Sequence, residues 1–216
     1  MGHDARQVAG DYYDFIPGQN GQLGMVVADV SDKGMPAALF MALSRSIVRA
    51  SMDRHLSPAE SIQRANRLIC QDSTSGMFIT LFYALLDPQA GQMTYVNAGH
   101  NPALYFQRGK LPGQGALHHL VRTGMALGVE AETPYEQRVL ALNPGDFLVM
   151  YTDGITDSVD PLGHSFEMDR LENLVLAHCE ETAQQIGHAL ENAIQDFTGG
   201  APGFDDITLL ILRRSI

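Results

Sequence analysis

Cysteine, positive charge and long apolar runs are scarce in this sequence, and each shortage excludes a class of protein. Two cysteines, Cys70 and Cys179, are too few for a disulfide framework, so we expect buried thiols in a reducing compartment. The 25 acids outnumber 14 lysines and arginines, and a net charge of -11 argues against nucleic acid or anionic lipid as the partner. No apolar stretch approaches the roughly 20 residues of a membrane span, and no signal-peptide pattern is present. We expect a cytoplasmic protein without direct membrane insertion.

The length and apolar content predict a single domain. The chain has 216 residues, 45% of them hydrophobic, and no Ser/Pro-rich linker or charge block divides it. We expect residues 1–5 to be a tag or linker remnant and residues 6–216 to form the domain. Because the motifs described below begin almost at once, we interpret the chain as a piece of a longer protein.

The order of the predicted elements indicates the fold class. We predict one helix from Met35 on and a second after Ser57-Pro58. Two more helices are predicted over 168–179 and 182–197. Loops are predicted over 108–115 and at His118-His119. A hairpin leads from residues 8–15 into the next strand, and 135–142 alternates weakly. The predicted strands cover 23–30, 78–86, 93–97, 103–106, 147–152 and 207–212. Strands and helices come in blocks without βαβ alternation, so we expect an α+β fold with mainly antiparallel sheet.

Acidic residues mark the ends of three apolar strands. Asp29 lies inside an apolar run, where a carboxylate is costly unless a cation meets it. Asp153, the pair Asp205-Asp206 and Asp11 are further candidates. Carboxylates without accompanying cysteines or paired histidines suit Mg²⁺ or Mn²⁺, which would permit in-line attack of a metal-activated water on a phosphoryl group. Taken singly, each acid also fits a turn former, because aspartate beside glycine is common in turns.

Five motifs in order give this pattern a family context. They are Ala9-Gly10-Asp11-Tyr12-Tyr13-Asp14-Phe15, Asp29-Val30-Ser31-Asp32-Lys33-Gly34 with Pro36-Ala37-Ala38-Leu39, Asn97-Ala98-Gly99-His100-Asn101-Pro102, Thr152-Asp153-Gly154-Ile155-Thr156-Asp157 and Asp205-Asp206-Ile207-Thr208. Together they resemble the bacterial SpoIIE/RsbU-type serine phosphatase domain of the metal-dependent type 2C (PPM) protein phosphatases. The resemblance covers nearly the whole chain.

The resemblance implies a four-layer αββα sandwich, in which two mainly antiparallel sheets are flanked by helices, with two Mn²⁺ or Mg²⁺ ions at one end. By motif, Asp29 would bridge both ions and the Val30 carbonyl would bind one of them. Asp153 and Asp205 would complete the site of the first ion, and Asp11 would serve the second. Asp29 and Asp153 would be the catalytic residues, with a metal-activated water as the nucleophile.

Other positions are assigned weaker roles or depart from the family pattern. Asp206 would contact the metal ligands and not the ions themselves. Asp14 and Asp157 are candidates for water-mediated or additional-metal contacts. Ser31 stands where many relatives have a histidine suggested as general acid. His100 replaces the aspartate that binds a third ion in eukaryotic relatives, which argues against a third ion here. The phosphate-holding arginine of the wider class has no clean match, and the candidates to replace it are Arg6 and Lys33.

The implied activity is hydrolysis of phosphoserine on a regulatory protein, by family analogy a STAS-domain anti-anti-sigma factor. The domain would be the output module of a larger bacterial signalling protein with an upstream sensory or receiver domain. We expect it to lack an N-terminal strand and helical lead-in, and the edge this exposes would favour a homodimer. The alternative is a pseudophosphatase that binds a partner without turnover. A two-metal hydrolase of small phosphoesters is disfavoured, because no basic or aromatic cluster is evident.

Overall fold

Two antiparallel sheets form the centre of the molecule. The computed structural model describes residues 10–53, 55–72, 76–111, 113–199 and 206–215. The first sheet has the order β1-β2-β3-β4-β7 and the second the order β6-β5-β8-β9. The strands of the first sheet are β1 (Tyr12–Pro17), β2 (Leu23–Val30), β3 (Ile79–Asp87), β4 (Gln92–Ala98) and β7 (Arg138–Ala141). Those of the second are β5 (Ala103–Arg108), β6 (Gly115–Leu120), β8 (Phe147–Tyr151) and β9 (Leu209–Arg213).

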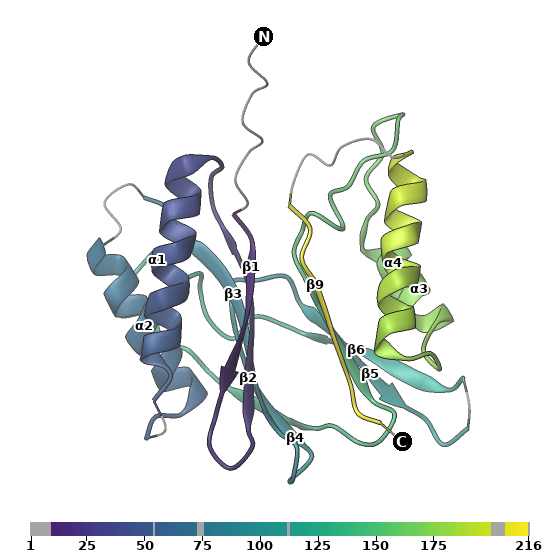
Figure 1. Ribbon diagram of the computed structural model, residues 1–216, viewed down its shortest axis with the longest axis horizontal. Helices are drawn as coiled ribbons and strands as arrows, with labels where there is room; N and C mark the ends of the chain where they lie inside the picture. The colour runs from purple at the N-terminus through teal and green to yellow at the C-terminus, as the bar shows by residue number, and fades with distance from the viewer. Residues whose placement is uncertain (1–9, 54, 73–75, 112, 200–205, 216) are drawn as a thin grey trace.

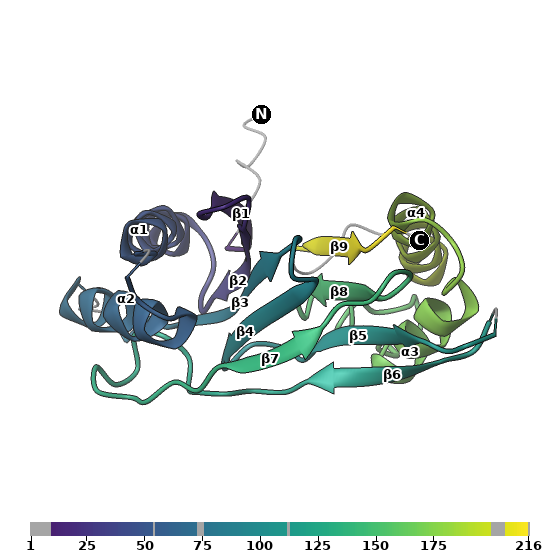
Figure 2. The same cartoon turned by 90° about the horizontal axis from the view of Figure 1, so that it is seen from below.

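Helices cover the outer face of each sheet, as Figures 1 and 2 show. Helices α1 (Met35–Ser51) and α2 (Pro58–Asp72) pack on the first sheet, and α3 (Met168–Ala177) and α4 (Ala183–Thr198) pack on the second. A third apolar cluster, which includes Met25, Phe82 and Met150, fills the space between the sheets. The predicted α+β fold with a four-layer arrangement is confirmed. No helix within the described ranges has both the length and the apolar character needed to cross a bilayer.

The two rows of side chains on β2 explain where Asp29 lies. Val26 and Ala28 belong to the core under α1 and α2, whereas Met25 and Val27 belong to the core between the sheets. Because side chains alternate along a strand, Asp29 continues the row of Met25 and Val27. It is half-buried at the end of that row, where β2 stops at Val30 and the turn to α1 begins. The apolar alternation of the strand therefore carries this carboxylate to one end of the space between the sheets.

The helix-facing row of β1 carries a buried ion pair. Asp14 is 6% exposed and accepts hydrogen bonds from Arg49 Nε at 2.9 Å and from Arg45 Nη2 at 3.1 Å, both on α1. Burial alone would raise the pKa of the Asp14 carboxyl, but the hydrogen bonds and charges of Arg49 and Arg45 outweigh it and hold the pKa below its usual value. The pair ties the edge strand β1 to the first helix.

Replacing Asp14 by asparagine is expected to lower the free energy of unfolding at neutral pH by about 1–2 kcal/mol, because two arginines lose their buried partner while they stay half-exposed. A depressed carboxyl pKa stabilises the fold above the unfolded-state value near 3.8 and loses that effect as the pH falls through the folded-state pKa. The difference from the parent protein should therefore shrink in acid. Urea unfolding of the variant and the parent at pH 7 and pH 3 measures the loss of stability at neutral pH and its decrease in acid.

The control for this ion pair is Glu132→Gln. It breaks the exposed contact of Arg67 Nη2 with Glu132 Oε2, which is 2.9 Å long, and should leave the stability nearly unchanged. Equal losses from Asp14→Asn and Glu132→Gln would contradict the special role of the buried pair.

One predicted loop is wrong, because His118 and His119 lie in β6. The strand is at the edge of its sheet and only Leu120 is buried, so the alternation that marks a strand is missing from the sequence. The His118 ring stacks on Tyr105 with centroids 5.9 Å apart, and His119 Nε2 lies 2.9 Å from Glu172 Oε1 on α3. The weak alternation over 135–142 becomes β7, and the last predicted strand begins two residues late, at Leu209.

Candidate metal centre

Asp11 and Asp29 meet at one end of the sandwich. The side chains of these two acids share a hydrogen bond, and Asp11 Oδ2 also accepts one from Thr152 Oγ1 at 2.5 Å. Thr152 follows the last residue of β8, so this contact joins the start of β1 in the first sheet to the end of β8 in the second. The hydroxyl of Thr152 is itself fixed, since it accepts the Thr208 N–H at 2.9 Å.

Gly10 and Gly154 allow the acid-bearing segments to approach closely. A Cβ atom on Gly10 would lie 3.4 Å from the Val30 carbonyl oxygen and 3.9 Å from Asp29 Oδ1, so both oxygens face the same point. The Gly10 N–H donates to Asp206 Oδ2 at 2.8 Å. A Cβ atom on Gly154 would overlap the Asp206 carbonyl oxygen. The turn after β8 and the segment before β9 are therefore in contact through glycine.

The crowding of acids changes the protonation of Asp11. Burial raises the pKa of the Asp11 carboxyl to about 6, the hydrogen bonds from Thr152 and Asp29 oppose this shift, and the negative charge of Asp206 adds to it. A carboxylate in such surroundings is stabilised by any cation that reaches it. The oxygen donors at this end, carboxylates and one main-chain carbonyl, are those that Mg²⁺ and Mn²⁺ prefer.

The raised pKa of Asp11 predicts an unusual pH dependence of stability for the metal-free protein. The folded state binds a proton on Asp11 up to about pH 6, whereas the unfolded chain releases it near 3.8. The folded state therefore holds more protons in this window, and the contribution of Asp11 to the free energy of unfolding falls as the pH rises from about 4 to 6. Urea titrations in EDTA across this range should show that Asp11→Asn removes the decrease. A variant with the same slope as the parent would contradict the assignment.

The other predicted ligands have separate positions. Asp153 is half-buried in the turn after β8, directly after the Thr152 that binds Asp11, and its carbonyl accepts the Asp157 N–H at 2.8 Å. Asp157 is exposed, and Asp205 lies outside the described residues. Within the described part of the chain, no group of three or more acidic, histidine or cysteine side chains is close enough together to hold an ion.

Asp14 does not join the acids. It shares the helix-facing row of β1 with Tyr12, on the opposite side of the strand from Asp11, and its carboxylate pairs with Arg45 and Arg49. The structure thus gives this residue partners different from those expected of a metal-site carboxylate.

Ser31 is bound to the main chain of the segment before β3. Its Oγ accepts the Phe78 N–H at 2.9 Å, and its own N–H donates to the Phe78 carbonyl at 3.0 Å. The serine that stands in place of the histidine of many relatives therefore binds the start of the turn after β2 to the segment before β3. Of the two candidate cations, Lys33 is exposed in that turn and Arg6 lies outside the described residues.

The comparison with known proteins now decides the family. A family model described as Stage II sporulation protein E (SpoIIE) matches residues 19–215. The chain belongs to the SpoIIE family. The SpoIIE domain is a serine phosphatase domain of the PP2C type, as the resemblance implied. A curated relative, phosphoserine phosphatase RsbU of Bacillus subtilis, is 31% identical over 215 residues, covering 98% of the chain and 61% of RsbU. The chain therefore spans less than two thirds of the length of this relative.

Solved structures support the same fold. The SiaA-PP2C domain of Pseudomonas aeruginosa has a TM-score of 0.81 at 21% identity, covering 95% of the chain and 80% of that domain. The structure of the RsbU and RsbW domains of Rv1364c from Mycobacterium tuberculosis has a TM-score of 0.77 at 24% identity, covering 99% of the chain and 57% of that structure. The structure of RsbX in complex with magnesium has a TM-score of 0.65 at 16% identity, covering 98% of the chain and 90% of RsbX. At these identities the likeness establishes the fold of the SpoIIE domain.

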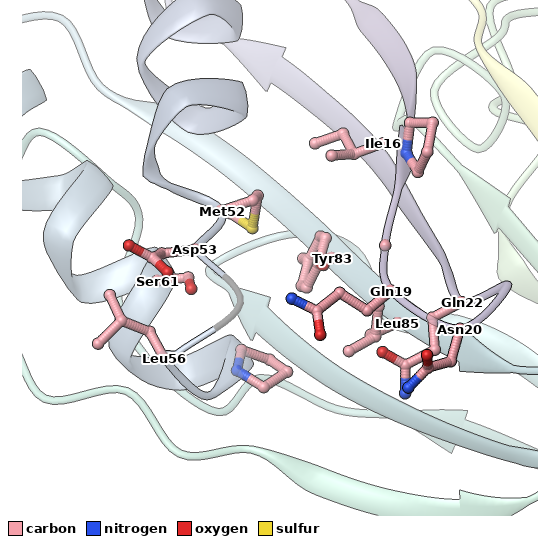
Figure 3. Close-up of a pocket in the computed structure, with 13 residues that line it drawn as sticks. Ile16, Gln19, Asn20, Gln22, Met52, Asp53, Leu56, Ser61, Tyr83 and Leu85 are labelled. Carbon is pink, nitrogen blue, oxygen red and sulfur yellow. The ribbon is translucent and has the colours of Figure 1, made fainter.

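A cavity of about 320 Å³ has neither Asp11 nor Asp29 among its lining residues. Figure 3 shows the residues that line it. It is enclosed by the β1–β2 turn and the connection from α1 to α2, with Gln19 and Met52 among its lining residues and Tyr83 and Leu85 of β3 along one side. It is thus on the helix side of the first sheet, at the hairpin end of β2, whereas Asp29 lies on the other face at the far end. The acidic end of the SpoIIE domain and this cavity are separate features.

Two threonines in the site were not predicted from the sequence. Thr152 binds Asp11, and Thr80 lies directly opposite Asp29 in the β2–β3 register, where its Oγ1 is 2.7 Å from His100 Nδ1. A threonine at a strand end is ordinary for a sheet, so its type carries no signal. What could have pointed to these two threonines was their position: Thr152 lies inside a motif that carries an acid, and Thr80 lies opposite one.

Proposed function

We propose that the SpoIIE domain is a metal-dependent phosphatase that removes phosphate from phosphoserine on a regulatory protein. The observation that carries this proposal is the meeting of Asp11, Asp29 and the Val30 carbonyl beside Asp206 at one end of the sandwich. These groups come from three separate motifs and gather in one partly buried place. A turn-forming role explains each aspartate alone but gives no reason for their convergence.

We propose that these residues hold two Mn²⁺ or Mg²⁺ ions, since carboxylate and carbonyl oxygens are the ligands that such ions prefer. Asp29 would bridge them, the Val30 carbonyl, Asp153 and Asp205 would hold one, and Asp11 would hold the other. Bound ions would supply Lewis acidity toward water and toward a phosphoryl oxygen. The raised pKa of Asp11 fits this use, because a cation would replace the proton that the crowded carboxylate retains below about pH 6.

The protein side chains prepare the site for this chemistry. Thr152 fixes one oxygen of Asp11, and the Gly10 N–H fixes one oxygen of Asp206, so these carboxylates are oriented before any ligand arrives. Ser31 Oγ accepts the Phe78 N–H, and a hydroxyl does not titrate near neutral pH as an imidazole does, so we do not give Ser31 the role of the missing histidine. We therefore assign protonation of the serine leaving oxygen to a water molecule.

A protein substrate agrees with the surroundings of the acids. Phe78, bound to Ser31 through its main chain, is 38% exposed, and Ile207, which follows Asp206, is 44% exposed. A protein surface that docks at the acids would remove these two apolar side chains from water. We propose a STAS-domain anti-anti-sigma factor as that protein, and a larger signalling chain with an upstream sensory or receiver domain as the setting.

Release of phosphate from a phosphoserine STAS-domain protein tests this proposal. We expect release with Mn²⁺ or Mg²⁺ and none in EDTA, measured beside p-nitrophenyl phosphate as a small substrate. Equal release in EDTA would contradict the proposed metal centre. Metal-dependent hydrolysis of p-nitrophenyl phosphate without action on a phosphoprotein would contradict the protein substrate. Stable binding of the phosphoprotein without turnover would favour the pseudophosphatase alternative.

A further inference from the structure

His100 connects the two sheets at the end where the acids gather. The side chain is 3% exposed and lies between β3 of the first sheet and the end of β8 of the second. Its Nδ1 is 2.7 Å from Thr80 Oγ1, and its Nε2 is 3.1 Å from the Tyr151 carbonyl oxygen. One imidazole ring thus makes a polar contact with each of the two sheets.

The partners determine the direction of both hydrogen bonds. A carbonyl oxygen only accepts, so Nε2 carries a hydrogen and donates it to Tyr151. Burial lowers the pKa of the His100 imidazole to about 4; the bond to Tyr151 opposes this shift and the charge of Arg122 adds to it. The ring is therefore neutral at pH 7, Nδ1 accepts, and the Thr80 hydroxyl donates. Both ring nitrogens are engaged with protein atoms.

Both partners of His100 are neighbours of proposed metal ligands. Thr80 pairs with Asp29 in the β2–β3 register, and residues directly opposite in an antiparallel pair point to the same face. Tyr151 precedes Asp153 by two residues at the end of β8. The contacts of the ring therefore link the strand beside Asp29 to the strand that leads to Asp153.

The main chain around His100 is held as firmly as the ring. The His100 N–H donates to Asn97 Oδ1 at 2.8 Å, and Asn97 Nδ2 donates to the Leu120 carbonyl of the second sheet at 3.1 Å. Gly99 has a φ of 72°, and a Cβ atom there would lie 2.8 Å from the Ala126 nitrogen. These contacts of Asn97 and Gly99 fix the main chain that carries the imidazole.

We propose that His100 is a positioning residue that sets the separation of Asp29 and Asp153 through one hydrogen bond to each sheet, anchored by the Thr80 hydroxyl. This inference rests on the proposed metal centre, since it concerns the spacing of its ligands. It assigns His100 no direct contact with metal or substrate, although its motif occupies the place of a metal-binding aspartate in other relatives.

Calorimetric titration with Mn²⁺ tests this role. Thr80→Val keeps the shape of the side chain and removes the donor, and we expect the Mn²⁺ affinity to fall by about tenfold or more. Thr80→Ser restores the hydroxyl and should restore the affinity. Thr94→Val is the matched control, because Thr94 lies at the other end of the neighbouring strand β4. Unchanged affinity in Thr80→Val, or an equal loss in Thr80→Ser, would overturn the proposal.

A spectroscopic measurement on the parent protein keeps the test independent of how the variants fold. Nitrogen-15 spectra of histidine-labelled protein at pH 7 should show His100 with a protonated Nε2 and an unprotonated Nδ1, with and without Mg²⁺. A protonated Nδ1 would overturn the proposal, because Nδ1 could then not accept the hydrogen bond from the Thr80 hydroxyl. If the parent protein binds no Mn²⁺, the metal centre itself fails, whereas normal binding by Thr80→Val overturns only the role of His100.

Discussion

Replacing Asp29 by asparagine is expected to reduce the metal-dependent phosphatase activity at least about a thousandfold, which corresponds to roughly 4 kcal/mol of transition-state stabilisation. Asp29 is the proposed bridge between two ions, so its loss removes a ligand from both. Phosphate release under saturating Mn²⁺ measures the effect. Raising the metal concentration should recover little of the activity, because an amide oxygen carries no charge.

The same substitution should leave the fold intact. Asparagine has the shape of aspartate, and its amide can donate to Asp11, which shares a hydrogen bond with Asp29 in the parent protein. Circular dichroism and urea unfolding in EDTA check this point. The matched control is Asp87→Asn, a strand-end carboxylate at the opposite end of the same sheet, where Oδ1 accepts the main-chain N–H groups of Gln89 and Ala90. Equal loss of activity in both variants would contradict the role of Asp29.

Replacing Gly154 by alanine is expected to lower activity by about a hundredfold and the free energy of unfolding by about 2–3 kcal/mol. The added Cβ atom would overlap the Asp206 carbonyl oxygen, which is main chain and has no other rotamer to adopt. The turn after β8 must therefore separate from the segment before β9. That movement displaces Asp153 relative to Asp206, and both stability and Mn²⁺ affinity should fall.

Gly187→Ala is the control for this substitution. Gly187 lies inside α4, where a Cβ atom would be 3.8 Å from Ile211 Cδ1, an ordinary contact, and alanine favours a helix over glycine by about 0.5–1 kcal/mol. We expect Gly187→Ala to be at least as stable as the parent and fully active. Full activity in Gly154→Ala would show that the close approach at Asp206 is not needed.

The sequence predicted the elements that have strong periodicity. The apolar run of β2 and the proline near the start of α1 are strong local signals, so the bounds of β2, the start of α1 and the place of Asp29 could be anticipated. β6 could not, because an edge strand buries little and its two histidines give no alternation. The family motifs then supplied the pairing of acids that are distant in the chain.

The rows of β1 contained a signal that was not used. Asp11 and Asp14 are three residues apart and so lie on opposite faces of an extended chain, which already separates their environments. Arg45 and Arg49, four residues apart on one helix, form the matching cation pair for Asp14. By contrast, the contacts of Thr80 with His100 and of Thr152 with Asp11 depend on how the two sheets stack, and local patterns do not encode that distance.

A diffraction experiment on crystals grown with Mn²⁺ tests the metal centre most directly. The anomalous signal of manganese should give two peaks about 3.5–4 Å apart, both within bonding distance of the Asp29 carboxylate, with Asp11 and the Val30 carbonyl among the other ligands. The His100 imidazole should remain between Thr80 and Tyr151 without touching either ion. Manganese bound elsewhere, or an Asp29 carboxylate that contacts neither peak, would contradict the account.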